Sequence, residues 1–447
     1  MDFKIEKKLK NNLGRPACAG RAGVLKTAHG EIQTPAFVVV ATKGTVKSLT
    51  PEQVMNTGAE VVLANTYHLY LQPGDELVKS MGGLNKMMNW NGPTMTDSGG
   101  FQAFSLGVAY DYGISKFIAS DSPSLEVVEE AYDTLRKNKK AQITEDGVKF
   151  QSIIDGSEHF LSPEKSIQIQ HNLGADIIFA FDECTSPHAP YKYIKEAMER
   201  THRWAERSLI EHQKLSPVSD KIEESYLEGV SQRDGARGSA TPAGVDSDPI
   251  KKNSSIFFQA LFGIVQGGRY RDLREESAKI IGAMDFDGFG IGGSFIKEDM
   301  DEAVKWVNSI LPEEKPRHLL GVGEPEDLFS AIENGCDLFD CVAPTRIARN
   351  GTLYTKNGKI SLMNTKYRND LNPIEEDCGC YVCGGRNSVY SRAYIAHLFH
   401  AKEMLASTLA SIHNIYFIVN LVKKIRQSIL DDNFFEFKEN FLKNYLK

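Results

Sequence analysis

The chain lacks the long apolar segments on which membrane proteins depend. No stretch approaches the roughly 20 consecutive apolar residues of a membrane-spanning helix. Residues 1–8 carry too many charges for the apolar region of a signal peptide. We therefore expect a globular protein that works in the cytoplasm and has no membrane partner.

Positive charge is not in excess, so the overall composition does not indicate a nucleic-acid partner. Lys and Arg number 52 against 59 Asp and Glu, which gives a formal net charge of −7. Any RNA would have to be held by a local basic surface, and the candidates lie after Asp340. They are Arg346, Arg349, Lys356, Lys359, Lys366, Arg368, Arg386 and Arg392. Charge alone favours a solvated charged surface for these residues.

Cysteine is sparse and unevenly placed. Of seven cysteines, three crowd into Cys378, Cys380 and Cys383, and four are scattered. A reducing compartment with one metal site explains this pattern better than a disulfide framework does. Three thiolates within six residues can wrap a tetrahedral ion that needs one more ligand, and the alternative is a set of free buried thiols. The candidates for the fourth ligand are His397, His400 and His413.

Short apolar runs recur along the chain, and helical patterns such as 162–173 and 271–284 separate several of them. Apolar strands that alternate with helices indicate a parallel sheet covered on both faces. Eight strands form a (β/α)8 barrel, and a doubly wound open sheet is the alternative. The eight runs are 35–40, 61–64, 94–96, 177–181, 261–265, 288–291, 318–322 and 337–339.

Polar residues or glycines stand at the C-terminal ends of most of these runs. A single Asp in such a place is typical of a helix cap or a turn. In a barrel, however, the strand ends converge on one mouth, where active sites are built, so a whole series of them favours a site. The series is Asn65, Asp97, Asp182, Gln266, Gly292, Gly293 and Asp340.

Two regions interrupt the pattern. The region near 107–140 has a mixed helical pattern, and the region near 214–255 contains a stretch with little to bury, which indicates a surface loop. The C-terminal residues 399–445 have a helical pattern and could pack on the barrel or on another subunit.

Several motifs, in order along the chain, resemble those of the tRNA-guanine transglycosylases. They are NTYHL at 65–69, TDSGGFQ at 96–102, FDEC at 181–184, FGIVQGG at 262–268 and FDCVAPTR at 339–346, followed by CGCYVC at 378–383. The resemblance implies a (β/α)8 TIM barrel with an inserted zinc-binding subdomain and C-terminal helices, in agreement with the strand pattern. We expect a catalytic barrel over 1–345, with insertions near 107–140 and 214–255. The zinc-binding subdomain, the last barrel helix and the C-terminal helices would then occupy 346–447.

The resemblance also implies roles for single residues. Asp340 would be the nucleophile and Asp97 the general acid/base. The residues implied to bind the base are Asp182, Gln266, Gly293, Phe101, Asn65 and Glu298. Arg346 and Arg349 would grip the anticodon loop of tRNA. Cys378, Cys380, Cys383 and His413 would hold one structural zinc ion.

The reaction implied is the exchange of guanine at the wobble position of a GUN anticodon for preQ1 (7-aminomethyl-7-deazaguanine). Two inversions through an aspartate–ribosyl intermediate would retain the configuration at the sugar. Cys184 and Ile296 resemble the bacterial members that insert preQ1, and a branched Ile296 should narrow the pocket against the bulkier queuine. The family further implies a homodimer through the zinc subdomain.

Other functions stay open at this point. A queuine-inserting enzyme differs only in the incoming base, and an archaeal-type enzyme would carry an RNA-binding domain after the zinc region. A catalytically silent RNA-binding subunit is disfavoured, because both carboxylates, Asp97 and Asp340, are present. A zinc hydrolase would need ligands at strand ends, where we expect His68 and His318 to satisfy local hydrogen bonds instead.

Overall fold

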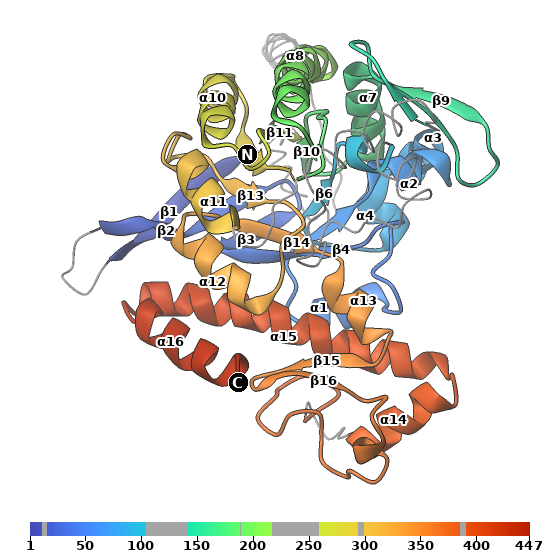
Figure 1. Ribbon diagram of the computed structural model, residues 1–447. Coiled ribbons are helices and arrows are strands. Elements are labelled where there is room, and N and C mark those ends of the chain that lie inside the picture. Colours follow the sequence, from blue (N-terminus) through green and yellow to red (C-terminus); the bar gives the residue numbers. More distant parts are fainter. Residues whose placement is uncertain (11–15, 104–140, 188, 217–258, 294–298, 385–389) are drawn as a thin grey trace, which may run out of the picture.

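The computed structural model describes residues 1–10, 16–103, 141–187, 189–216, 259–293, 299–384 and 390–447. Eight parallel strands close into a barrel, with helices between them, so the predicted (β/α)8 fold is confirmed (Figure 1). Almost all of the two predicted insertions lies outside the described residues. In barrel order, the strands are β10 (Ile177–Phe179), β11 (Ala260–Val265), β12 (Gly288–Ile291), β13 (Arg317–Leu319), β14 (Leu338–Cys341), β4 (Ala36–Val40), β5 (Val62–Ala64) and β6 (Thr94–Thr96).

All eight predicted strands are present, although some end elsewhere than predicted. The run 318–322 contributes only β13 (Arg317–Leu319). The chain turns away after it, because the Gly321 N–H donates to the side chain of Asp340 at 3.1 Å and Gly321 has a φ of +77°. Strand ends of this kind depend on side-chain partners, which apolar patterning does not reveal.

Helices follow the strands and cover the outside of the barrel. The two predicted from amphipathic patterns are α7 (Pro163–Leu173) and α10 (Arg271–Gly282). α7 begins after Ser162, whose hydroxyl accepts a hydrogen bond from the Lys165 N–H at 3.2 Å. The other described helices up to residue 348 are α1 (Pro51–Asn56), α2 (Thr66–Leu71), α3 (Asp75–Ser80), α4 (Gly83–Met88), α8 (Tyr191–Leu215), α11 (Met300–Asn308), α12 (Pro325–Glu333) and α13 (Ala343–Ala348).

A three-stranded antiparallel sheet lies at the other end of the barrel, away from the strand C-termini. It consists of β1 (Asp2–Lys10), β2 (Pro16–Thr27) and β3 (Gly30–Thr34). Arg21 of β2 donates two hydrogen bonds, of 2.9 and 2.7 Å, to Asp337, which directly precedes β14. Both side chains are buried. This ion pair therefore fastens the sheet to the barrel.

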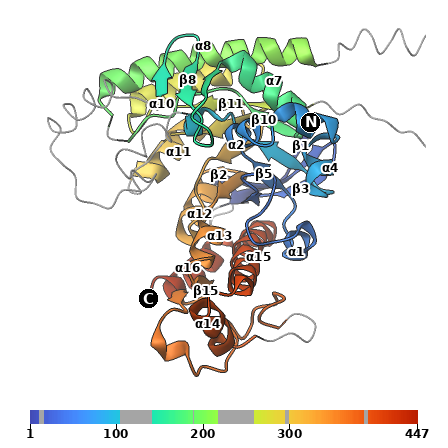
Figure 2. The same ribbon diagram turned by 90° about the vertical axis from the view of Figure 1, so that its right-hand side faces the viewer.

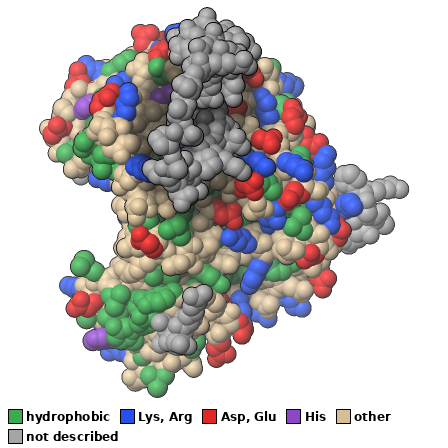
Figure 3. Space-filling model, turned by 180° about the vertical axis from the view of Figure 1, so that it is seen from behind, with side chains coloured by type: hydrophobic (Ala, Val, Ile, Leu, Met, Phe, Trp, Pro, Cys, Tyr) green, Lys and Arg blue, Asp and Glu red, His purple; other side chains and the backbone are tan. Residues whose placement is uncertain are grey.

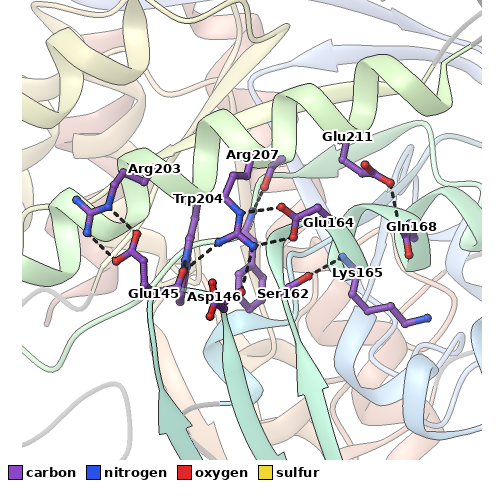
Figure 4. A network of polar contacts seen from close by, with 12 residues as sticks. Glu145, Asp146, Ser162, Glu164, Lys165, Gln168, Arg203, Trp204, Arg207 and Glu211 are labelled. Carbon is purple, nitrogen blue, oxygen red and sulfur yellow. Dashed lines mark hydrogen bonds and ion pairs between the residues drawn. The ribbon is translucent and has the colours of Figure 1, made fainter.

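A second small sheet, formed by β7 (Ala141–Ile143), β8 (Val148–Gln151) and β9 (Glu158–Leu161), packs on α8. Arg203 and Arg207 of α8 make paired hydrogen bonds of 2.6–2.9 Å to Glu145 and Glu164 (Figure 4). The indole N–H of Trp204 donates to the carbonyl of Glu145 at 2.7 Å. These contacts fasten the turn between β7 and β8, and the start of α7, to α8.

The C-terminal part forms a lower lobe beneath the barrel in both ribbon views (Figures 1 and 2). Its long helix α15 contacts α13 and α14, and it also contacts β4 and β2, so the predicted C-terminal helices pack on the barrel. The boundary at residue 345 stays a prediction. The elements of this lobe are β15 (Thr352–Thr355), β16 (Gly358–Ser361), η2 (Thr365–Tyr367), α14 (Arg392–His400), α15 (Met404–Leu430) and α16 (Phe434–Tyr445).

Helix α15 is also long and apolar enough to cross a membrane, judged by length and composition alone. However, 72% of its most apolar window is buried inside the protein. Core helices of soluble proteins pass the same test, so α15 is weak evidence for a membrane span.

Candidate active site

A cavity opens at the C-terminal ends of the barrel strands. The predicted site residues that line it are Asp97, Phe101, Asp182, Gln266, Gly293 and Asp340. They come from distant parts of the sequence, and the closed barrel brings them together. Glu298, the remaining predicted base-binding residue besides Asn65, lies outside the described residues, as does Ile296.

Asp97 directly follows β6 and is held by groups from the start of α2. The side-chain amide of Asn65 donates to Oδ2, and the Thr66 N–H donates to Oδ1 at 2.9 Å. Asn65 also caps α2, because its Oδ1 accepts a hydrogen bond from the His68 N–H at 3.0 Å. Asn65, predicted to bind the base, therefore lies against Asp97 and fixes the orientation of this carboxylate.

Asp182 and Gln266 form a buried polar pair just beyond the ends of the neighbouring strands β10 and β11. Gln266 Nε2 donates to Asp182 Oδ2 at 2.7 Å, and the Ser98 hydroxyl donates to Oδ1 at 2.9 Å. Gln266 Oε1 is buried and has no hydrogen-bond partner among the described residues. A buried acceptor without a hydrogen-bond partner lowers the free energy of unfolding by about 1–3 kcal/mol. A ligand N–H in the cavity would satisfy it.

Gly293 brings backbone next to this pair. Its φ of +100° favours glycine, and a Cβ at this position would lie 3.1 Å from Gln266 Oε1 and 2.6 Å from Arg274 Nη2. Arg274 is fully buried on α10, and its Nη1 donates to the carbonyl of Gly292 at 2.7 Å. Burial lowers the pKa of Arg274 to about 10, so it still carries its charge at neutral pH. Arg274 therefore anchors the strand end from which Gly293 faces the cavity.

Asp340 lies on β14, and two donors hold one of its oxygens. Oδ1 accepts hydrogen bonds from His318 Nε2 at 2.9 Å and from the Gly321 N–H at 3.1 Å. The His318 side chain is fully buried, and that of Asp340 is 15% exposed. His318 does make the hydrogen bond that we expected, but its partner is the predicted nucleophile.

The sequence pattern gave His318 only a local hydrogen bond and did not single out Arg274. Both interrupt an otherwise apolar buried pattern, one on a strand and one on the inner face of an amphipathic helix. A charged or titratable residue at such a position was the available signal. Such a residue does not reveal its own hydrogen-bond partner, because that contact depends on how neighbouring strands and loops are aligned.

A basic surface adjoins the mouth of the barrel. Arg346 is exposed on α13, and Arg349 directly follows this helix. Lys43 and Lys47 are exposed on the loop that follows β4, the strand paired with β14. The pKa of Lys47 is lowered first by partial burial and then by the charges of Arg349, Lys43 and Arg346, so these cations lie near one another. The two lysines do not stand out in the sequence, because they lie far from the basic residues that follow Asp340.

A second cluster, in the lower lobe, consists of Cys378, Cys380, Cys383 and His413. All four are buried, and their ligand atoms lie within 4.8 Å of one another. The three Sγ atoms lie 3.8, 3.6 and 3.4 Å from His413 Nδ1. A tetrahedral zinc site, with bonds of about 2.3 Å to sulfur and about 2.0–2.1 Å to nitrogen, puts S and N about 3.6 Å apart.

His413 is oriented for this purpose by its other nitrogen. Nε2 donates to the carbonyl of Tyr354 at 2.8 Å, which turns Nδ1 toward the thiolates. The cluster thus contains His413 and not the rival candidates His397 and His400. The predicted fourth position is confirmed as part of a group that could hold a metal ion.

Comparison with known proteins agrees with the geometry. The chain matches the family described as "Queuine tRNA-ribosyltransferase" over residues 17–112, 107–233 and 248–447. A queuine tRNA-ribosyltransferase of Desulforamulus reducens is 45% identical over 444 residues, which cover 99% of this chain and 98% of that protein. The corresponding protein of Caldanaerobacter subterraneus subsp. tengcongensis is 44% identical over 428 residues, with 95% and 94% covered. The chain therefore belongs to the queuine tRNA-ribosyltransferase family, the pentosyltransferases also called tRNA-guanine transglycosylases.

Proposed function

We propose that this protein exchanges guanine at the wobble position of tRNAs with a GUN anticodon for preQ1. The observation that carries the proposal is a single cavity that contains two carboxylates, Asp97 and Asp340, together with a buried base-reading pair. A nucleobase offers an amide edge and an exocyclic amine, which the pair of Asp182 and Gln266 and the nearby backbone of Gly293 can bind. Phe101 lines the same cavity and supplies a stacking surface.

Asp340 acts as the nucleophile in this proposal. Its carboxylate attacks C1′ of the ribose while the bond from C1′ to guanine breaks, which inverts the sugar and forms an ester. The incoming base then attacks C1′ from the opposite face, and the Asp340 carboxylate leaves. Two inversions restore the original configuration.

Asp97 moves the protons. Guanine is a poor leaving group unless it is protonated, and the incoming base must lose a proton before it leaves the site as part of the tRNA. One carboxyl group that alternates between its acid and base forms serves both halves of the reaction. The donors from Asn65 and Thr66 hold this group at the cavity wall.

The choice of preQ1 rests on the wall of the cavity. Cys184 lines it, in a position where the bacterial members of the family resemble this chain. Ile296 and Glu298 lie outside the described residues and support this choice from sequence alone, since a branched Ile296 is expected to narrow the pocket and Glu298 matches the acidic position expected near the aminomethyl group. A queuine-inserting enzyme is the alternative.

The tRNA would be gripped beside the mouth by Arg346 and Arg349. The exposed Lys43 and Lys47 near them support a basic patch at this position, in a chain whose overall charge is negative. The target base must leave its stack to enter the cavity, and an unpaired anticodon loop permits this. We place the protein in the cytoplasm.

The metal site would hold one zinc ion through Cys378, Cys380, Cys383 and His413. Four protein ligands leave no open position, so the ion would stabilise the lower lobe and supply no chemistry at the barrel mouth. One zinc per chain in metal analysis of the purified protein is the expected result.

A base-exchange assay tests the function. A tRNA with a GUN anticodon, labelled with guanine, is incubated with preQ1 and either the wild type or Asp340→Asn, which keeps the shape and removes the charge. We expect release of label by the wild type and a loss of at least about 10³-fold in the variant. Release with queuine but not with preQ1 would correct the substrate. No release from folded, zinc-loaded wild type would favour a silent RNA-binding subunit.

A further inference from the structure

His318 is a titratable side chain in the interior of the barrel, directly below the cavity. It lies on β13, which pairs with β14, the strand that carries Asp340. Its ring is fully buried and packs edge-on against Phe179, with centroids 5.4 Å apart. Phe179 also lines the cavity, so the imidazole lies between the apolar barrel interior and the proposed reaction site.

Only one side of this imidazole is satisfied. Nε2 lies 2.9 Å from Asp340 Oδ1, whereas Nδ1 is buried without a hydrogen-bond partner in the part of the chain that the structure describes. A carboxylate can only accept, so Nε2 carries a hydrogen and donates it to Asp340 Oδ1. A purely structural position would be served at lower cost by an apolar side chain, because unsatisfied buried nitrogen opposes folding.

We propose that His318 is a positioning residue for the nucleophile, acting through its Nε2–H on Asp340 Oδ1. The inference rests on the proposed function. With Oδ1 held by His318 and by the Gly321 N–H, Oδ2 is the oxygen that attacks C1′. In that step the C1′–Oδ2 bond forms, the bond from C1′ to guanine breaks, and guanine leaves with a proton from Asp97.

The hydrogen bonds from His318 and Gly321 to Oδ1 affect formation of the ester intermediate and its breakdown to different extents. In the ester intermediate, Oδ1 is a neutral carbonyl oxygen and accepts only weak hydrogen bonds. When the incoming base attacks, the C1′–Oδ2 bond breaks and the carboxylate regains its negative charge, while Asp97 accepts the proton of the base. Hydrogen bonds to a charged acceptor are stronger than those to a neutral one, so Nε2–H stabilises the departing carboxylate. Loss of His318 should therefore slow breakdown of the intermediate more than its formation.

A matched pair of variants separates this role from packing. His318→Gln keeps an N–H donor on an unbranched side chain, and His318→Met has a similar length without a donor. We expect His318→Met to lower kcat by about 10²-fold, the size of effect that misplacement of a reacting group by about 1 Å produces. KM for tRNA should fall together with kcat, because the covalent intermediate accumulates, so kcat/KM for tRNA, which reports formation of the intermediate, should change much less than kcat. His318→Gln should recover most of the lost kcat.

The tRNA-linked enzyme provides the decisive readout. It is trapped on denaturing gels during turnover with preQ1, and a larger fraction of covalent complex is expected in His318→Met than in the wild type or in His318→Gln. Equal kcat in all three proteins overturns the inference, and so does a loss in which His318→Gln and His318→Met are equally impaired. A melting temperature far below that of the wild type identifies a variant that fails to fold. The kcat and the covalent fraction of the other variant then test the inference.

The same assays separate the inference from the proposed function. If wild type and Asp340→Asn both fail to exchange bases, the proposed function has failed. If wild type is active, Asp340→Asn is inactive and His318→Met is unaffected, only the role of His318 is wrong.

Discussion

At the residue scale, the base pocket depends on backbone where a side chain would intrude. Gly293 adopts a φ of +100°, with Arg274 and Gln266 close to the position of a Cβ. Gly74 has the same φ of +100°, but nothing lies within 4 Å of a Cβ built there. The two glycines thus share a φ that residues with a Cβ rarely adopt, and they differ in what surrounds that position.

We therefore predict that Gly293→Ala raises KM for preQ1 by at least about tenfold, whereas Gly74→Ala leaves it unchanged. A displaced Gln266 would leave polar groups of the base unpaired, at a cost of about 1–3 kcal/mol. Both variants should lose a similar amount of stability from the strained φ, about 1–2 kcal/mol. Steady-state kinetics and urea unfolding measure the two effects. An unchanged KM in Gly293→Ala would show that this backbone does not contact the base.

Residue-scale contacts were the least predictable part of the molecule. The motifs indicated which residues gather at the mouth, because every strand end of a barrel points there. They did not reveal that His318 holds Asp340, since that contact depends on the alignment of β13 with β14. Nor did they reveal that Asn65 faces Asp97, which depends on how α2 leaves β5.

At the element scale, the barrel strands were predictable for a physical reason. A parallel strand buried on both faces consists almost entirely of apolar residues, and the runs 35–40 and 261–265 match β4 and β11 to within one residue. The antiparallel sheets β1–β3 and β7–β9 were not predicted. Their strands are half exposed or short, so their alternating pattern is weak.

The packing of α7 on α8 contains a pair of histidines that should respond to acid. His171 Nε2 and His212 Nδ1 lie 2.9 Å apart, so one ring donates and the other accepts. Burial lowers the pKa of His171 to about 4, with a further contribution from His212, and burial also lowers the pKa of His212. In the unfolded chain both histidines titrate near pH 6.5.

Because the unfolded state binds more protons between pH 6.5 and pH 4, the free energy of unfolding should fall as the pH decreases through that window. We expect the pair to account for about 1–3 kcal/mol of this loss, after allowing for the partial exposure of His171. His171→Gln should flatten the decline between pH 7 and pH 5 in urea unfolding. His400→Gln, at an exposed position on α14, is the control and should keep the wild-type slope. Equal slopes in all three proteins would contradict the prediction.

At the scale of the whole molecule, the lower lobe carries an apolar surface that is exposed among the residues that the structure describes. Figure 3 shows hydrophobic side chains gathered there. Tyr390 and Tyr394 stack with ring centroids 5.9 Å apart, and Tyr381 lies next to Tyr390. Tyr381 is 50% exposed and Tyr394 is 41% exposed. Contiguous exposed apolar surface of this kind marks protein–protein contacts.

We propose that this surface, formed by Tyr381, Tyr390 and Tyr394, joins two copies of the chain into a homodimer through the zinc subdomain. The buried Cys–His cluster supports a contact at this surface, because the cluster fixes the loop that carries Tyr381 against α15. In a symmetric dimer, Tyr394 would meet the same patch of the second copy, so one substitution changes the interface twice.

Tyr394→Glu should therefore convert the dimer into a monomer, measured by light scattering coupled to size-exclusion chromatography. Leu77→Glu places the same charge on α3, at a position that is 51% exposed, and should leave the dimer intact. The two variants alter charge equally, so a difference between them locates the contact. A wild type that elutes as a monomer at micromolar concentration would contradict the dimer itself. Dimers in both variants would instead place the interface elsewhere on the molecule.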